Sequence, residues 1–442
     1  MKRNHIIFIS CFIFYGCILN ASDQIPAPPQ SQPIALLNGT IHPLTAPVLE
    51  NGMILFDEGK IVEIGALVDI PPDAIRVDVS GKHVYPALIE TYSQLGLTEI
   101  GAVRPTRDYS EIGDINPNVC AEVAINPESE LIPVARANGV ALAVTLPSGG
   151  MISGKSALLM LDGWTWEDMT LKAPVSLLLN WPRMRVISAW WMRETSEQQR
   201  VQIKKQIDIL EKAFREAEAY KVAREAAERK GIPFHKFDVR WEAMIPVLRG
   251  ELPVWVRANS LQQIEAAVNW ADQQRVKMVL VGGADAWRVA DLLKRKQIAV
   301  IIPSIFQLPF RRDADYDEPF TLPLKLHEAG IKFCIASSST SNMRNLPYHA
   351  AKAAAHGLPK EEALKAITLY PAEIIGVAER VGSLEKGKDA TLMVTDGDPL
   401  ELTTQVERLY IQGKDVDLNN KHRMLYRKYK ERYSQLKQNI HR

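Results

Sequence analysis

The chain has 442 residues, of which 53 are basic, 52 are acidic and 46% are hydrophobic. This balanced charge excludes the strongly basic surface that general nucleic-acid binding requires, and the length allows two domains with sizeable buried cores. The apolar fraction is that of an ordinary soluble globular protein.

The first 21 residues have the pattern of a secretory signal peptide. Lys2 and Arg3 precede an apolar run of fourteen residues, IIFISCFIFYGCIL, which is short for a bilayer crossing, and the small residue Ala21 follows. A proline-rich linker over residues 22–33 comes next. The sequence therefore predicts an exported protein, periplasmic or secreted, with no transmembrane span after signal removal. The residues FYGC leave lipoprotein processing open as the less favoured alternative.

Strand-like runs flank a long middle section. Residues 34–86 contain IALLNGTIH, GMILFDEGKIVEIG and IRVDVSGKHVYP, in which DEGK is a hairpin signal. Residues 377–415 repeat this idiom with VGSLEKGKDATLMVTDGDP. We therefore expect the two flanks to meet in one small, discontinuous β-sandwich.

The middle section, residues 87–376, alternates strand-length apolar runs with helical patterns. The clearest strands are 140–146, 252–258, 277–283, 299–304 and 332–338. This alternation predicts a (β/α)₈ barrel. A charged helical insertion is expected over residues 195–230. A basic amphipathic helix is expected over residues 416–442, packed through Leu425, Tyr429 and Tyr433, with contact to a membrane or a partner as the less favoured alternative.

Residues 149–156, GGMISGKS, match the phosphate-loop pattern letter for letter. A phosphate loop needs a helix that starts at the lysine, so that backbone amides face the phosphates. Here the strand-length run ALLMLDGW follows instead. The stretch is therefore interpreted as a glycine-rich hairpin, with Lys155 an ordinary loop lysine.

The segments HVYPALIETYSQLG and VWVRANSLQQIEAAV, together with the C-terminal block ITLYPAEIIGVAERVGSLEKGKDATLMV, resemble the amidohydrolase superfamily. The nearest branch looks like the imidazolonepropionase-related proteins, and the resemblance covers roughly residues 34–415. It implies a hydrolase acting on non-peptide C–N bonds, with histidines and an aspartate at strand ends holding one or two divalent ions.

The usual metal ligands are replaced at each corresponding position. Tyr92 and Gln94 stand where the family has its first histidine pair, and Arg257 stands where it has a histidine after the fifth strand. Gly282 and Gly283 end the next strand, where the family has another histidine. The last strand continues as CIASSSTSNMRN, without an acidic residue. The resemblance therefore implies a degenerate member of the superfamily whose usual metal ligands are replaced, and we expect no cofactor.

The histidine positions lead to the same expectation. No two histidines are closer than seven residues apart, and His349 and His356 lie two helical turns apart, about 10.8 Å, too far for a shared ion. The nine positions are 5, 42, 83, 235, 327, 349, 356, 422 and 441.

Polar residues at the carboxyl ends of the predicted barrel strands could form an anion site in place of the metal site. Arg257 offers a guanidinium fork for a carboxylate or phosphate, unless it pairs with a carboxylate from the loop after the first strand. The other candidate ligand-binding residues are Tyr92, Gln94, Arg104, Arg107, Ser337, Ser339 and Asn342. Asp108 and Glu99 are candidate general bases if they are buried.

Three functions remain open at this point. The first is a metal-free protein that binds a small anionic or cyclic amide-like ligand. The second is an active hydrolase or isomerase that works without a metal or with an atypical ion. The third is a structural partner that forms a homo- or hetero-oligomer with an intact homologue.

Overall fold

The structure is a computed structural model that describes residues 24–188, 190–231 and 236–440. The expected signal peptide lies outside these ranges. None of the helices within them combines the length and the apolar composition that a bilayer crossing requires.

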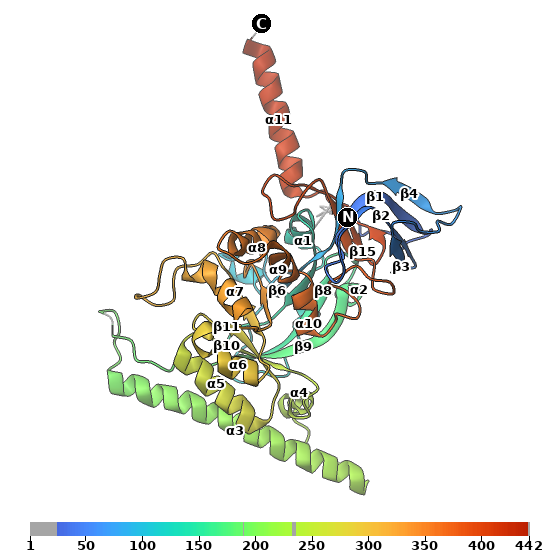
Figure 1. Ribbon diagram of the computed structural model, residues 1–442. Coiled ribbons are helices and arrows are strands. Elements are labelled where there is room, and N and C mark those ends of the chain that lie inside the picture. Colours follow the sequence, from blue (N-terminus) through green and yellow to red (C-terminus); the bar gives the residue numbers. More distant parts are fainter. Residues whose placement is uncertain (1–23, 189, 232–235, 441–442) are drawn as a thin grey trace, which may run out of the picture.

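An eight-stranded sheet forms the barrel at the centre of the molecule (Figure 1). Its order is β13-β12-β11-β10-β9-β8-β7-β6, and its strands are buried along nearly their whole length except for the first half of β9. The bounds are β6 Leu88–Ser93, β7 Val140–Thr145, β8 Ile152–Met160, β9 Thr170–Asn180, β10 Val254–Ala258, β11 Met278–Gly282, β12 Val300–Ile302 and β13 Phe333–Ile335. All five strands predicted most clearly for this section are confirmed.

The barrel departs from a regular (β/α)₈ arrangement at β8. This strand runs antiparallel to both of its neighbours, β7 and β9, whereas the remaining neighbouring pairs are parallel. Antiparallel neighbours need only a tight turn, which Gly149 and Gly150 supply with positive φ. The glycine-rich hairpin at this place is confirmed, since the chain enters β8 and not a helix.

Helices follow the later strands in the expected alternation. Helix α5 (Leu261–Gln274) follows β10 and begins with a capping box between Ser260 and Gln263. The others in this half are α6 Ala290–Arg295, α7 Glu318–Glu328, α8 Leu346–Ala354, α9 Lys360–Lys365 and α10 Leu369–Ile375. The earlier helices are α1 Leu131–Arg136, α2 Trp166–Met169 and α4 Val239–Leu248.

The two flanks of the chain meet in a second eight-stranded sheet. Strand β14 pairs antiparallel with β5, with Val394 opposite Val84, so the C-terminal strands join the N-terminal ones. The predicted turn at Glu58–Gly59, with both φ values positive, closes the β2–β3 hairpin. A two-layer sandwich and the exact domain limits stay predictions. The strands are β1 Ile34–Ile41, β2 Leu49–Asp57, β3 Lys60–Gly65, β4 Ile75–Asp78, β5 His83–Pro86, β14 Leu392–Thr395, β15 Val406–Ile411 and β16 Lys414–Asp415.

Two long helices extend from this body (Figure 1). Helix α3 (Ser196–Lys230) confirms the predicted insertion; it starts at a capping box on Thr195 and ends at Gly231 in the left-handed conformation. Helix α11 (Lys421–Ile440) projects away from the barrel. Its expected packing through Leu425, Tyr429 and Tyr433 is wrong, because all three side chains are exposed.

Candidate functional site

Glu90 in β6 connects the first and last strands of the barrel. It is fully buried, and its Oε2 accepts hydrogen bonds from the backbone N–H and the hydroxyl of Ser337, at 2.9 and 2.5 Å. Its Oε1 accepts the backbone N–H of Tyr92 at 2.8 Å. Strands β6 and β13 are the two edges of the barrel sheet, so this carboxyl group bridges the seam between them.

Burial dominates the acid–base behaviour of Glu90. It raises the pKa of the carboxyl group from 4.5 to about 7, although the hydrogen bonds from Ser337 and Tyr92 act in the opposite direction. Sequence reasoning did not name this residue as part of a site. The available signal was a lone carboxylate inside the apolar run ALIETY, because glutamate is almost never fully buried without partners.

Arg257 shows the opposite arrangement. It is the fourth residue of β10, it is exposed, and across the described ranges no ion pair or side-chain hydrogen bond involves it. Burial raises the pKa of Tyr92, and the positive charge of Arg257 acts in the opposite direction. Since β10 and β6 are not neighbours in the sheet, this influence acts across the barrel opening. The pairing of Arg257 with a loop carboxylate is therefore wrong.

The end of β11 leaves no room for a ligating side chain. Gly282 has a φ of +102°, and a Cβ there would lie 2.4 Å from Oδ1 of Asn259 and 2.9 Å from the carbonyl oxygen of Ala258. Within the described residues, no group of three or more histidine, cysteine, aspartate or glutamate side chains is placed to hold a metal ion. The donor set at the strand ends does not fit a divalent ion held by imidazoles.

Two histidines come together elsewhere, which their separation of 41 residues in the sequence conceals. Nε2 of His42 and Nδ1 of His83 lie 3.0 Å apart in the sheet of the flanks, and His42 stacks on Tyr85. Burial, reinforced by His83, lowers the pKa of His42 to about 4. His349 is buried against Phe306, and its Nδ1 accepts the backbone N–H of Ile305. Each of these three histidines thus has one ring nitrogen in contact with a protein hydrogen-bonding partner.

The other predicted site residues lie on two loops. After β13, Ser339 accepts the backbone N–H of Asn342, which is exposed. Gln94 directly follows β6 and is half-buried. These residues line the same end of the barrel sheet as Tyr92 and Ser337, because they follow the carboxyl ends of β6 and β13.

The long loop after β6 does not bury its charged residues. Arg104, Arg107 and Asp108 are exposed, and Arg107 makes one long contact of 3.5 Å with the hydroxyl of Tyr109. Glu99 is half-buried and accepts a hydrogen bond from Asn126. The burial that a general base at Asp108 would require is therefore absent, whereas Glu90 in β6 is fully buried.

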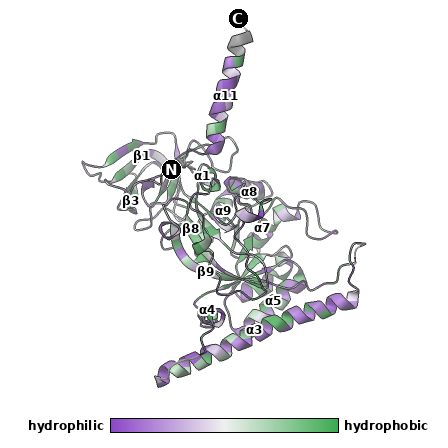
Figure 2. Ribbon diagram, turned by 180° about the vertical axis from the view of Figure 1, so that it is seen from behind, coloured by the Kyte–Doolittle hydropathy of each residue, from purple (hydrophilic) through white to green (hydrophobic). Residues whose placement is uncertain are grey.

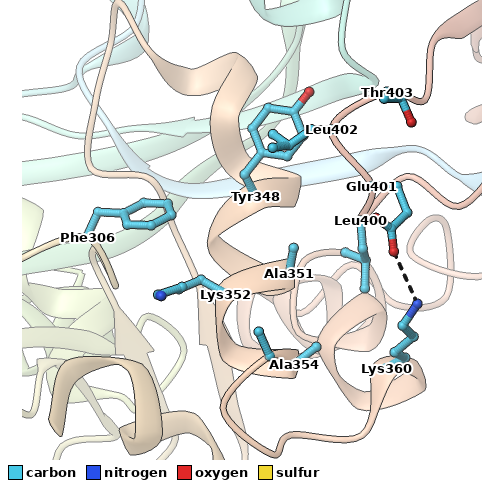
Figure 3. A pocket seen from close by; sticks show the side chains of 11 residues that line it. Phe306, Tyr348, Ala351, Lys352, Ala354, Lys360, Leu400, Glu401, Leu402 and Thr403 are labelled. Carbon is cyan, nitrogen blue, oxygen red and sulfur yellow. Dashed lines mark hydrogen bonds and ion pairs between the residues drawn. The ribbon is translucent and has the colours of Figure 1, made fainter. Parts of the chain in front are cut away.

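A separate groove of about 530 Å³ lies on the outside of the barrel between α8, α9 and the loop before β15 (Figure 3). Its lining is mostly apolar, with Tyr348, Leu400 and Leu402 among the contributing side chains. Two lysines, Lys352 and Lys360, also line the groove, and Lys360 is paired with Asp398 and Glu401. None of the predicted site residues lines this groove.

Comparison with known proteins agrees with the fold. The Amidohydrolase family profile matches residues 273–420. The chain is 21% identical over 399 residues to the amidohydrolase tasK of Hapsidospora irregularis. The aligned region covers 82% of this chain but only 39% of the length of that protein. An amidohydrolase from Thermotoga maritima superposes with a TM-score of 0.77 at 25% identity, covering 87% of this chain and 99% of that one.

A more distant structure shares the fold alone. A prolidase complexed with N-methylphosphonate-L-proline superposes with a TM-score of 0.53 at 16% identity, over 87% of this chain and 100% of that chain. The strand-to-helix order that positions Tyr92, Arg257 and Ser337 thus belongs to a fold seen in several amidohydrolases and related enzymes.

Proposed function

We propose, from the premise that this chain belongs to the amidohydrolase superfamily, that it binds a small cyclic amide-like carboxylate at the barrel mouth without an imidazole-held metal. One observation carries the proposal: Arg257 is exposed at a strand end and is without an ionic partner in the described ranges. We also propose that the chain belongs to the imidazolonepropionase-like branch of this superfamily and that it is exported.

Arg257 supplies the specificity in this account. Its guanidinium presents a planar fork of N–H donors that matches the two oxygens of a carboxylate. Tyr92 and Gln94 add a hydroxyl and an amide, which can donate to and accept from the polar edge of a cyclic amide. Tyr92 and Arg257 are the next-to-last residues of β6 and β10, and Gln94 directly follows β6, so a rigid sheet positions them.

The test is calorimetric titration of the mature chain with L-pyroglutamate, a cyclic amide that carries one carboxylate. L-Pyroglutamide is the matched control, because it keeps the ring and loses the charge. We expect the acid to bind at least about tenfold more tightly than the amide, as befits a charge-assisted pair. Equal affinities, or no binding of either compound, would reject the proposal.

A second candidate is a metal-independent hydrolase, and the contact between Ser337 and Glu90 favours it. The hydroxyl oxygen of Ser337 lies 2.5 Å from Oε2 of Glu90, whose pKa of about 7 suits a general base near neutral pH. Both residues are buried, which fits the seam contact better than attack on a substrate. Reaction with a fluorophosphonate followed by peptide mass spectrometry distinguishes the two, because only an activated serine becomes labelled.

A further inference from the structure

Helix α11 carries a continuous apolar stripe that nothing in the described chain covers. Leu425, Tyr429, Tyr433 and Leu436 are spaced four, four and three residues apart, which places them on one face of the helix. All four are exposed, and Tyr433 leaves 63% of its surface accessible. Tyr426 lies beside them and is also exposed.

Cations border this stripe. Between residues 421 and 436 the helix has six basic residues and one acidic residue, although the whole chain is balanced. At 100° per residue, Lys428 and Arg432 lie on one side of the stripe and Lys430 on the other. No ion pair formed within the described ranges involves any of the six basic side chains.

Asn420 caps the start of α11. Its side chain is buried, its Oδ1 accepts the backbone N–H of Arg423, and its backbone carbonyl oxygen accepts the backbone N–H of Met424. Just before it, the backbone carbonyl oxygen of Asn419 accepts a hydrogen bond from the side chain of Gln24. Beyond this cap, the helix projects with green apolar bands among purple polar ones (Figure 2). Its twenty residues give a length of about 30 Å.

Helix α3 differs from α11 in its packing and in the pairing of its charges. It buries Leu210, Phe214 and Tyr220 against the body. Its exposed face is crossed by pairs such as Arg215 with Glu211 and Lys212 with Glu216. Helix α3 thus packs one face against the body and pairs charges on its exposed face. The described residues of α11 beyond its cap do neither.

We propose that α11 is a surface anchor for a bilayer rich in anionic phospholipid. Tyrosine and leucine side chains enter the interfacial layer, while lysine and arginine contact headgroup phosphates on both sides. Excess positive charge makes a second copy of the same helix a poor partner. An anionic lipid surface satisfies the apolar stripe and both rows of cations at once.

The test is sedimentation of the full mature chain with vesicles of phosphatidylcholine alone and of phosphatidylcholine with phosphatidylglycerol. The variant Lys428→Gln/Lys430→Gln/Arg432→Gln removes three cations, and Tyr429→Gln/Tyr433→Gln interrupts the stripe. Lys204→Gln/Lys205→Gln/Lys212→Gln on exposed positions of α3 is the matched control. Circular dichroism of each variant shows whether helix content is retained.

We expect binding to the anionic vesicles only, weakened by salt and reduced at least about tenfold by the triple α11 variant. The tyrosine variant should also lose binding, and the α3 control should bind like the parent chain. The proposal is overturned if neither vesicle is bound, if neutral vesicles bind equally, or if the α3 control loses as much as the α11 variant. It is also overturned if light scattering shows that α11 pairs two copies.

Discussion

Glu90 and Arg257 lie at opposite sides of one barrel, and the fold treats them in opposite ways. Glu90 is withdrawn from water and has protein donors on both oxygens. Arg257 remains in water, and the described chain offers it no counter-charge. An ionisable group whose partners are supplied by the protein holds structure together, whereas one left without partners near a strand end is available to a ligand.

The largest expected effect comes from breaking the Glu90 side of this contrast. Glu90→Ala would leave the backbone N–H of Tyr92 and two donors of Ser337 buried without an acceptor. Each such group costs about 1–3 kcal/mol, so we expect a loss of about 3–5 kcal/mol in the free energy of unfolding. Urea denaturation at pH 6 measures it. A loss below about 1 kcal/mol would show that the seam does not depend on this carboxyl group.

The pH dependence of stability gives the next effect. The folded pKa of Glu90 is about 7 and the reference value is 4.5, so the folded state holds an extra proton between these values. Stability contributed by this group therefore falls as the pH rises from about 4.5 to about 7, by roughly 3 kcal/mol. Glu90→Gln stays neutral and should lack this fall. Parallel slopes for the two proteins between pH 5 and pH 8 would argue against the raised pKa.

Replacement of Arg257 should affect binding and leave stability nearly unchanged. We expect Arg257→Ala to weaken L-pyroglutamate binding about 30-fold, equivalent to about 2 kcal/mol, because a charge-assisted pair is lost. Arg257→Lys keeps the charge but loses the planar fork of donors, so its affinity for L-pyroglutamate should lie between those of the parent chain and Arg257→Ala. The free energy of unfolding should change by less than about 0.5 kcal/mol, as for an exposed side chain. A large loss of stability with unchanged affinity would assign Arg257 a structural role.

The smallest effects are expected from the loop after β6. Arg104 and Arg107 are exposed like Arg257, but they lie on a loop and not at the end of a barrel strand. Arg104→Ala and Arg107→Ala should each change stability by less than about 0.5 kcal/mol and affinity by less than about threefold. An effect as large as that of Arg257→Ala would mean that the loop closes over the ligand.

Much of the fold could be read from local patterns. The clear strands were found because buried parallel strands read as uninterrupted apolar runs, and α3 was found from its charged periodicity. Strand β9 was missed because Lys172 and Pro174 interrupt its apolar run. The reversed direction of β8 follows from the glycine-rich hairpin predicted at residues 149–156, although a regular (β/α)₈ alternation does not contain such a strand.

The site depended on contacts that local patterns do not carry. The positions of Tyr92, Gln94 and Arg257 followed from their place in recognisable segments. The bridge from Glu90 to Ser337 spans 247 residues, and the contact between His42 and His83 is set by the pairing of β1 with β5. The exposure of Arg257 likewise depends on which loop side chains reach it, which sequence spacing does not determine.

The most direct test of the central claim is the affinity of the mature chain for L-pyroglutamate before and after exhaustive dialysis against EDTA, with metal content determined by plasma mass spectrometry. If Arg257 holds the ligand, the dissociation constant stays the same and the metal content is near zero in both samples. If a bound ion holds it, about one metal per chain is present at first. Binding would then disappear on dialysis and return when zinc or manganese is added.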